Sequence, residues 1–243
     1  MTYVRRNFNN ILEDCAKLFI DIRKAGVWPH VIIGIARGGW IPARIMCDLF
    51  TKPVLNDKTK SIEIQHPHLL NVGMRRYHVG KATETVEKVD FFQRLEGRAR
   101  QDVDGRVVLV VDEVFDVGKS MQYVIEDVRK ARPGKLYAAV LDYKTNAFDT
   151  SKTGARIKER AIAEAVVRKS IDGFFSSRKR LPSDWIIYPW EAIEETLGVY
   201  NETDSKSEVE ASLQKSGLPR TIKALINRNL ALFDELKKKQ AGK

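Results

Sequence analysis

The chain has 243 residues, of which 43% are hydrophobic and 30% are charged, and its formal net charge at pH 7 is +10. A chain of this length buries a sizeable core as one α/β domain with an appendage, or as one larger domain. The positive surplus is +5 in residues 1–150 (24 basic, 19 acidic) and +5 in residues 151–243 (18 basic, 13 acidic). Such a dispersed surplus attracts a polyanionic small substrate as well as a nucleic acid, so the net charge alone does not distinguish between these two ligands.

The two cysteines, Cys15 and Cys47, are far apart, and each lies in an apolar, helical pattern. This spacing indicates neither a disulfide framework nor a zinc site, and it fits a reducing cytoplasm. The sequence shows no N-terminal apolar core with a cleavage site and no run of eighteen apolar residues. We therefore expect a cytoplasmic, soluble protein without a membrane span.

The first elements predicted are a helix and a strand-turn-helix unit. Apolar positions at helical spacing indicate a helix over residues 8–25, which Gly26 ends. Residues 31–36 predict a buried strand, residues 37–39 a turn and residues 41–50 a helix. A second strand is predicted at residues 61–65.

Residues 67–104 carry few β-branched runs and many charges, which predicts a long loop that is either functional or mobile. Its basic side chains could cover a pyrophosphate, or they could belong to a solvated charged hairpin. These side chains are Arg75, Arg76, Lys81 and Lys88.

The most informative stretch reads VVLVVDEVFDVGKSM, from Val107 to Met121. Its first five residues suit a strand buried on both faces of a parallel sheet. Asp112 and Glu113 follow, at the strand end where ligands bind in open α/β sheets. Asp116 and the turn at residues 118–120 then lead into a helix, whose N-terminus favours an anion. The stretch predicts a site for a sugar phosphate.

A nucleotide-binding P-loop is the rival interpretation of this turn, because Gly118, Lys119 and Ser120 supply its last three residues. That motif needs a glycine five positions before Gly118, and residue 113 is Glu. The P-loop is therefore excluded. An ordinary β-turn-helix with solvated acids remains the structural alternative, and the number of constrained positions disfavours it.

The order of strand, acid pair, Asp116 and phosphate turn resembles the PRPP-binding motif of type I phosphoribosyltransferases. The resemblance implies that Asp112 and Glu113 hold the ribose hydroxyls, and help to hold Mg²⁺ through PRPP and water. It implies that Asp116 is the catalytic acid or base beside N7 of a purine, although a turn-forming role is also open. The implied PRPP-binding residues are Asp112, Glu113, Asp116, Val117, Gly118, Lys119 and Ser120, and the implied pyrophosphate loop is Arg37, Gly38 and Gly39.

After this motif a helix is predicted at residues 119–131 and a strand at residues 136–141, with Lys144 just beyond it. Residues 155–169 predict a basic helix, and residues 176–182 a loop. Further helices are predicted at residues 191–197, 206–215 and 219–238. Because strands alternate with helices, we expect an α/β fold with a parallel, doubly wound sheet and a C-terminal helical extension.

Residues 184–191 resemble the base-binding stretch of purine phosphoribosyltransferases, with Glu191 where the bacterial xanthine-guanine type has Asp. The resemblance implies that Trp185 stacks on the base, that Ile186 and Glu191 flank it, and that Lys144 donates to a 6-oxo group. Burial of Trp185 in a core and a surface position for Lys144 are the alternatives. Residues 1–150 would form the catalytic core, and residues 151–243 the base-binding segment and a helical bundle.

The predicted function is therefore transfer of phosphoribose from PRPP to a purine, in a homodimer. Lys144 favours hypoxanthine, guanine or xanthine, whereas the helical C-terminal part resembles adenine phosphoribosyltransferases of crenarchaeal type, so adenine is slightly preferred. A PRPP-sensing regulator that binds nucleic acid through Arg220, Lys223 and Arg228 is the alternative of another class. The base-binding stretch and the acid at position 116 favour the enzyme.

Overall fold

The computed structural model describes residues 2–79, 86–93, 95–145, 154–191 and 219–241. The chain divides into two compact units. The larger comprises residues 11–182, and the smaller comprises residues up to 10 together with residues from 183 onward.

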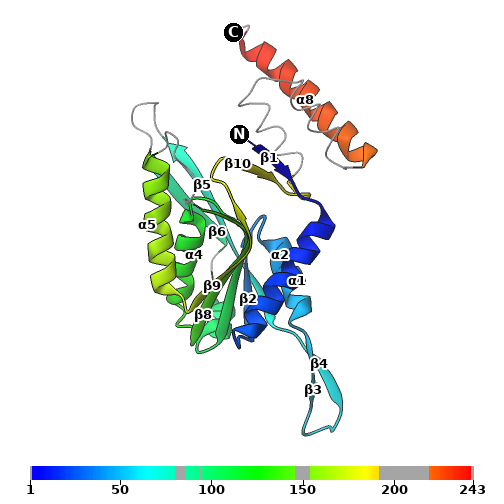
Figure 1. Cartoon of the computed structure of the whole chain (residues 1–243), viewed down its shortest axis with the longest axis vertical. Coiled ribbons are helices and arrows are strands. Elements are labelled where there is room, and N and C mark those ends of the chain that lie inside the picture. The colour runs from blue at the N-terminus through cyan, green and yellow to red at the C-terminus, as the bar shows by residue number, and fades with distance from the viewer. Residues whose placement is uncertain (1, 80–85, 94, 146–153, 192–218, 242–243) are drawn as a thin grey trace. The chain divides into compact units, whose positions relative to one another are not determined.

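A six-stranded sheet with the order β6-β5-β2-β7-β8-β9 forms the centre of the larger unit (Figure 1). All of its neighbouring strands pair in parallel except β5 and β6, which are antiparallel. The predicted α/β fold with a mostly parallel sheet is therefore confirmed. The strands are β2 (Val31–Ala36), β5 (His68–Val79), β6 (Val86–Gln93), β7 (Val107–Phe115), β8 (Lys135–Lys144) and β9 (Gly173–Arg180).

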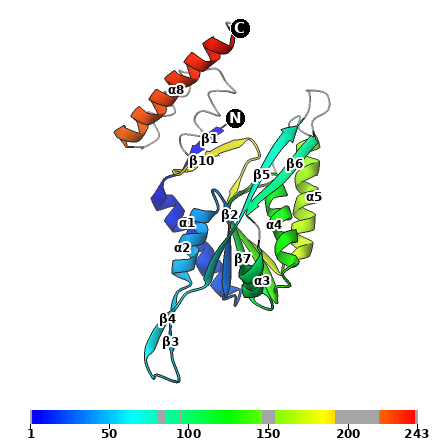
Figure 2. The same ribbon diagram turned by 180° about the vertical axis from the view of Figure 1, so that it is seen from behind.

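Helices cover both faces of this sheet, with α1 and α2 on one side and α4 and α5 on the other (Figures 1 and 2). Alternate residues of β2 serve the two layers: Ile33 packs with Val124 and Ile125 of α4 in one cluster, and Ile32 is buried on the opposite face. A strand covered on both faces must be apolar throughout, as the run at residues 31–36 is. The helices are α1 (Phe8–Lys24), α2 (Trp40–Leu49), α3 (Gly97–Val103), α4 (Lys119–Arg129) and α5 (Gly154–Ser170).

The loop predicted for residues 67–104 is wrong for most of its described length. The structure has β5, β6 and α3 there, and residues 80–85 and 94 lie outside the described residues. The first half of β5 is an ordinary core strand that pairs with β2. Its second half pairs only with β6. A two-stranded extension of this kind requires backbone pairing but no apolar face, so hydrophobic periodicity does not reveal it.

The loop predicted at residues 176–182 is also wrong, because β9 continues to Arg180. Buried acids compensate the polar side chains of this strand. Asp14 of α1 accepts hydrogen bonds from Ser177 Oγ at 2.7 Å and from Arg178 Nε at 2.8 Å. Asp142 of β8 accepts one from Arg180 Nε at 2.6 Å. The strand is thus stabilised by charge pairing rather than by an apolar run.

Two strand ends and the place of one strand need comment against the prediction. β7 does not stop before the acids but continues through Asp112 and Glu113 to Phe115. β8 likewise includes Lys144 as its last residue. The strand predicted at residues 61–65 exists as β4 (Ile62–Gln65), but it pairs with β3 (Lys52–Leu55) in a separate hairpin.

In the smaller unit, β1 (Thr2–Arg5) pairs in parallel with β10 (Asp184–Ile187), and α8 spans Arg220–Ala241. The last of these confirms the helix predicted at residues 219–238. The helices predicted at residues 191–197 and 206–215 fall almost wholly outside the described residues. No helix of the described ranges is long and apolar enough to cross a membrane.

Candidate active site

The carboxyl ends of β2, β7 and β8 lie side by side, since the three strands are parallel neighbours. The turn at residues 37–39 follows β2, the acids lie at the end of β7, and Lys144 ends β8. The fold therefore brings together the candidate residues of the larger unit, which are separated by more than a hundred positions in sequence.

The turn after β2 lies directly against the two acids of β7. A β-carbon on Gly38 would lie 2.6 Å from Oε2 of Glu113, and one on Gly39 would lie 2.8 Å from Oδ1 of Asp112. Real β-carbons do not approach other atoms so closely. Position 39 requires glycine because a β-carbon there would also meet backbone atoms of Val111 and Asp112, whereas at position 38 a side chain would force the end of the Glu113 side chain to move. The requirement comes from close packing, not from a left-handed backbone, because Gly39 has φ −66°. The glycine pair thus lets the turn approach the acids.

Asp112 is buried, and its Oδ1 accepts a hydrogen bond from the backbone N–H of Glu113 at 3.0 Å. Glu113 is half-buried beside the turn. The two carboxylates form an acidic group at the end of β7 with a fixed orientation. Such a group accepts hydrogen bonds from hydroxyls or from water on a cation.

The turn before α4 also depends on one glycine. Gly118 has φ +85°, the left-handed region that favours glycine, and a β-carbon there would overlap the ring of Phe115. Lys119 and Ser120 begin α4, so the backbone N–H groups of this first turn lie at a helix N-terminus. Val117 is buried and can offer only its backbone. This geometry suits a phosphate.

Asp116 lies between two basic side chains. Nζ of Lys144 is 3.3 Å from its Oδ2, and Nη2 of Arg160 is 3.2 Å from its Oδ1. Nε of Arg160 also donates to the backbone carbonyl of Asp116 at 2.5 Å. Lys144 is largely buried, so the surface position that the sequence left open is not the one observed. One side of the carboxylate is thereby anchored to α5, and the other is paired with β8.

Arg160 is the residue of this site that sequence reasoning missed. Its helix was predicted only as basic, yet Arg160 is 2% exposed and holds the turn at Asp116. The next residue back, Glu159, lies 3.6 Å from Nζ of Lys119, which was predicted to bind phosphate. One turn of α5 therefore contacts both ends of the phosphate turn. A buried arginine does not change the spacing of apolar residues along a helix. The sequence pattern therefore gave no sign of Arg160.

Comparison with known protein families identifies the family of this chain. The phosphoribosyl transferase domain matches residues 6–158, more than half of the sequence. The chain belongs to this family. It is therefore a phosphoribosyltransferase, as the motif at residues 107–121 predicts.

Known proteins similar to this phosphoribosyltransferase include xanthine phosphoribosyltransferase 1 of Saccharomyces cerevisiae, 26% identical over 76% of this chain and 88% of that one. A hypoxanthine-guanine phosphoribosyltransferase of Schizosaccharomyces pombe is 29% identical over 76% of this chain and 87% of its own. A solved structure, a hypothetical protein from Neisseria gonorrhoeae with bound ppGpp, is 23% identical, covers 83% of this chain and 94% of that chain, and has a TM-score of 0.58. That likeness supports the fold.

The two acids at the end of β7 suit a hydrated cation, not a metal ion that is coordinated by protein side chains alone. Among the described residues, no three His, Cys, Asp or Glu side chains cluster as a metal site. Mg²⁺ keeps several waters and binds through one or two carboxylates plus substrate phosphates. Asp112 and Glu113, beside a turn of close-packed glycines, match that donor set.

Apart from Lys144, the predicted base-binding residues belong to the smaller unit, and they are described there by themselves. Trp185 is half-buried in β10, so it is not a plain core tryptophan, whereas the side chain of Ile186 is buried. Glu191 donates its backbone N–H to the carbonyl of Tyr188 at 3.1 Å. The Tyr188 ring stacks on Trp190 with centroids 5.1 Å apart, an aromatic pair that the sequence analysis did not single out.

Proposed function

We propose that this phosphoribosyltransferase acts on 6-oxopurines, and converts hypoxanthine, guanine or xanthine with PRPP to the nucleoside 5′-monophosphate and pyrophosphate. The observation that carries the proposal is the adjacency of Lys144 and Asp116, 3.3 Å apart at the carboxyl end of the sheet. The names of the yeast relatives, which are xanthine and hypoxanthine-guanine phosphoribosyltransferases, agree with it.

The two side chains complement one edge of the base. A 6-oxopurine presents O6, an acceptor, next to N7, whereas adenine presents an amino group in the place of O6. The Lys144 ammonium has only protons to offer, so it pairs with O6 and opposes the adenine amino group. Asp116 then faces N7, where its carboxylate accepts a proton as the base reacts and returns it in the reverse direction. The donor at Lys144 therefore favours a 6-oxopurine over adenine, the base that the sequence slightly favoured.

The sugar and phosphates of PRPP would be divided among three segments. Asp112 and Glu113 accept hydrogen bonds from the ribose hydroxyls, and the N-terminus of α4 binds the 5′-phosphate through backbone N–H groups and Ser120. The turn at residues 37–39 holds the pyrophosphate, with Arg37 supplying a charge. Because Gly38 and Gly39 let this turn pack closely against Asp112 and Glu113, the turn and the acids would contact the same PRPP molecule.

In the reaction a purine nitrogen forms a bond to C1 of the ribose while the bond from C1 to the pyrophosphate oxygen breaks, through a sugar with oxocarbenium character. Mg²⁺, held by Asp112 and Glu113 through PRPP and water, would neutralise charge on the pyrophosphate. The protein contributes mainly position: it fixes the ribose, the leaving group and the base in line. Asp116 handles the one proton transfer at the base.

Stacking of Trp185 on the purine, with Ile186 and Glu191 beside it, and assembly as a homodimer complete the proposal on the strength of the family resemblance. The relatives' names as enzymes favour this function over the nucleic-acid-binding regulator.

The test is turnover with PRPP and Mg²⁺ against hypoxanthine, guanine, xanthine and adenine, followed by the ultraviolet absorbance of the nucleotide formed. The proposal predicts nucleotide from at least one 6-oxopurine, at a kcat/KM at least tenfold above that for adenine. Turnover of adenine alone would overturn the 6-oxopurine assignment, and binding of PRPP without turnover of any purine would overturn the purine assignment.

A further inference from the structure

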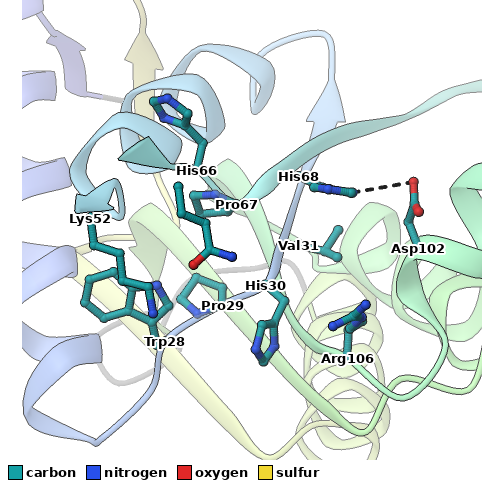
Figure 3. Close-up of a pocket in the computed structure, with 11 residues that line it drawn as sticks. Trp28, Pro29, His30, Val31, Lys52, His66, Pro67, His68, Asp102 and Arg106 are labelled. Atoms are coloured by element: carbon teal, nitrogen blue, oxygen red, sulfur yellow. Dashed lines mark ion pairs between the residues drawn. The ribbon is translucent and has the colours of Figure 1, made fainter. Parts of the chain in front are cut away.

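A polar cavity lies at the amino end of the sheet, away from the candidate active site. It has a volume of about 300 Å³ and is lined by side chains at the starts of β2, β5 and β7, together with residues of the β3–β4 hairpin and of α3 (Figure 3). Among them are His30, Lys52, His66, His68, Asp102 and Arg106. The cavity and the turn at residues 37–39 lie at opposite ends of β2, and the rise along this strand separates them by roughly 17 Å.

The floor of the cavity is built by backbone hydrogen bonds between the three strands. The N–H of His30 donates to the carbonyl of Val107 at 2.8 Å, and the N–H of His68 donates to the carbonyl of His30 at 2.9 Å. Cys47 Sγ lies 3.4 Å from the carbonyl of Pro67 at the side. The sheet therefore positions His30 and His68, whereas Lys52 belongs to the β3–β4 hairpin and Asp102 to α3.

The lining of the cavity carries two cationic side chains, Lys52 and Arg106, and one acid, Asp102. Within the part of the chain that the structure describes, neither Lys52 nor Arg106 forms an ion pair with a carboxylate. Lys52 lies over the ring of Trp28, 4.8 Å from its centroid. The acid in the lining, Asp102, lies 3.5 Å from Nδ1 of His68, and the two side chains form an ion pair when the imidazole is protonated. Two cations facing one cavity repel each other unless an anion lies between them.

His30 adds a neutral donor with a defined tautomer. Its Nδ1 accepts a hydrogen bond from the backbone N–H of Val107 at 3.2 Å, so the proton of the neutral ring is on Nε2. Desolvation lowers the pKa of His30, and the charges of Arg106 and Lys52 lower it further. The imidazole therefore stays neutral beside the cations and offers one N–H.

We propose that this cavity, which we call the amino-end pocket, binds a small phosphorylated anion at a site separate from the one where PRPP is proposed to bind. Arg106 supplies a planar fork of N–H groups, Lys52 a point charge and His30 a neutral N–H donor, the combination that recognises phosphate oxygens. The volume of about 300 Å³ admits a phosphate or pyrophosphate group together with a small attached moiety. This inference does not depend on which purine the enzyme uses.

Histidine side-chain NMR tests the proposal site by site. The chain has four histidines, three of which line the pocket. The fourth, His78, lies ten residues beyond His68 on β5, roughly 30 Å away by strand rise. Inorganic phosphate and pyrophosphate would be added separately, at constant pH and constant ionic strength in chloride. We expect saturable shifts of the His30, His66 and His68 resonances, whereas an anion that binds only at the proposed PRPP site would leave these three in place.

The matched variants are Lys52→Gln with Arg106→Gln, and the control pair Lys58→Gln with Arg44→Gln, which removes the same charge from exposed positions. The first pair should weaken the apparent affinity at least tenfold, and the control pair should leave it within about twofold. Amide spectra of each variant establish that the fold is retained. Imidazole resonances that do not move at millimolar anion, or that move equally in both pairs, would overturn the proposal.

Discussion

Nζ of Lys144 lies 3.3 Å from Oδ2 of Asp116, at the ends of neighbouring strands β8 and β7. Arg160 holds the other oxygen of the same carboxylate from α5. One oxygen of the Asp116 carboxylate is therefore held by Arg160, and the other lies beside Lys144, the donor proposed to bind the purine. This arrangement gives Asp116 a catalytic and a structural role at once, and the two roles make different predictions.

Asp116→Asn should lower kcat by about 10²- to 10⁴-fold, because an amide cannot accept the proton at N7. PRPP binding should be nearly unchanged, since the backbone N–H groups of the phosphate turn remain. Steady-state kinetics and calorimetry with PRPP measure the two quantities. Asp48→Asn, which removes an exposed acid paired with Arg44, is the control and should leave kcat unchanged. A kcat within threefold of wild type in Asp116→Asn would refute the proton-transfer role.

Alanine at the two glycines of the first turn should have different effects. At Gly39 a β-carbon meets backbone atoms, the Val111 carbonyl at 2.7 Å and Asp112 Cα at 2.8 Å. Gly39→Ala should therefore destabilise the fold by about 1–3 kcal/mol. At Gly38 it meets only the end of the Glu113 side chain, which can move. Gly38→Ala should therefore reduce activity more than stability.

A double-mutant cycle checks this interpretation. In a Glu113→Ala background, Gly38→Ala should cause no further loss of stability or activity, because the clashing carboxylate is gone. Urea denaturation and turnover of the four proteins measure the coupling. Additive losses would mean that Gly38 acts through something other than Glu113.

Arg160→Met should lower the free energy of unfolding by about 2–3 kcal/mol, because a buried residue loses hydrogen bonds to both the carbonyl and the carboxylate of Asp116. kcat should also fall, because the Asp116 carboxylate loses the guanidinium that orients it. A role in packing alone would leave kcat of the folded variant in place. Arg44→Met, at an exposed helix position, is the control and should alter neither stability nor kcat.

The lowered pKa of His30 predicts how stability depends on pH. The unfolded chain binds a proton at the ordinary histidine pKa of about 6.5, and the folded protein binds it only at lower pH. The stabilisation is therefore present above that value and is lost as pH falls through the folded pKa. His30→Asn keeps an acceptor for the Val107 N–H but does not titrate. Urea denaturation from pH 7.5 to 5 should show a steeper fall for wild type than for the variant, and equal slopes would contradict the assignment.

The sequence predicted those parts of the fold in which hydrophobic pattern and burial agree. β2 and the first half of β7 are apolar on both faces, and α1 and α4 carry one apolar stripe, so their places follow from periodicity. The strand β9 was missed because its polar residues are paired with buried Asp14 and Asp142, partners that are remote in sequence. β6 was missed because an edge hairpin needs no apolar face.

The candidate site follows the same division. Asp112, Asp116 and the glycine turns could be predicted because each is set by local backbone requirements within one short stretch. Arg160 could not, because its contact with Asp116 joins positions 44 residues apart, with α4 and β8 between them in the chain. Lys144 was placed by resemblance, and only the fold brings it beside Asp116.

The most direct test of the account is kcat/KM for hypoxanthine and for adenine, with saturating PRPP, in the wild-type protein and in Lys144→Gln. If Lys144 donates to O6, the wild type should prefer hypoxanthine, and the variant should lose about 10- to 10³-fold of its hypoxanthine activity. Its adenine activity should stay the same or rise, because the opposed donor is gone. An equal fall with both bases, or a wild-type preference for adenine, would contradict the assignment of Lys144 and the 6-oxopurine function with it.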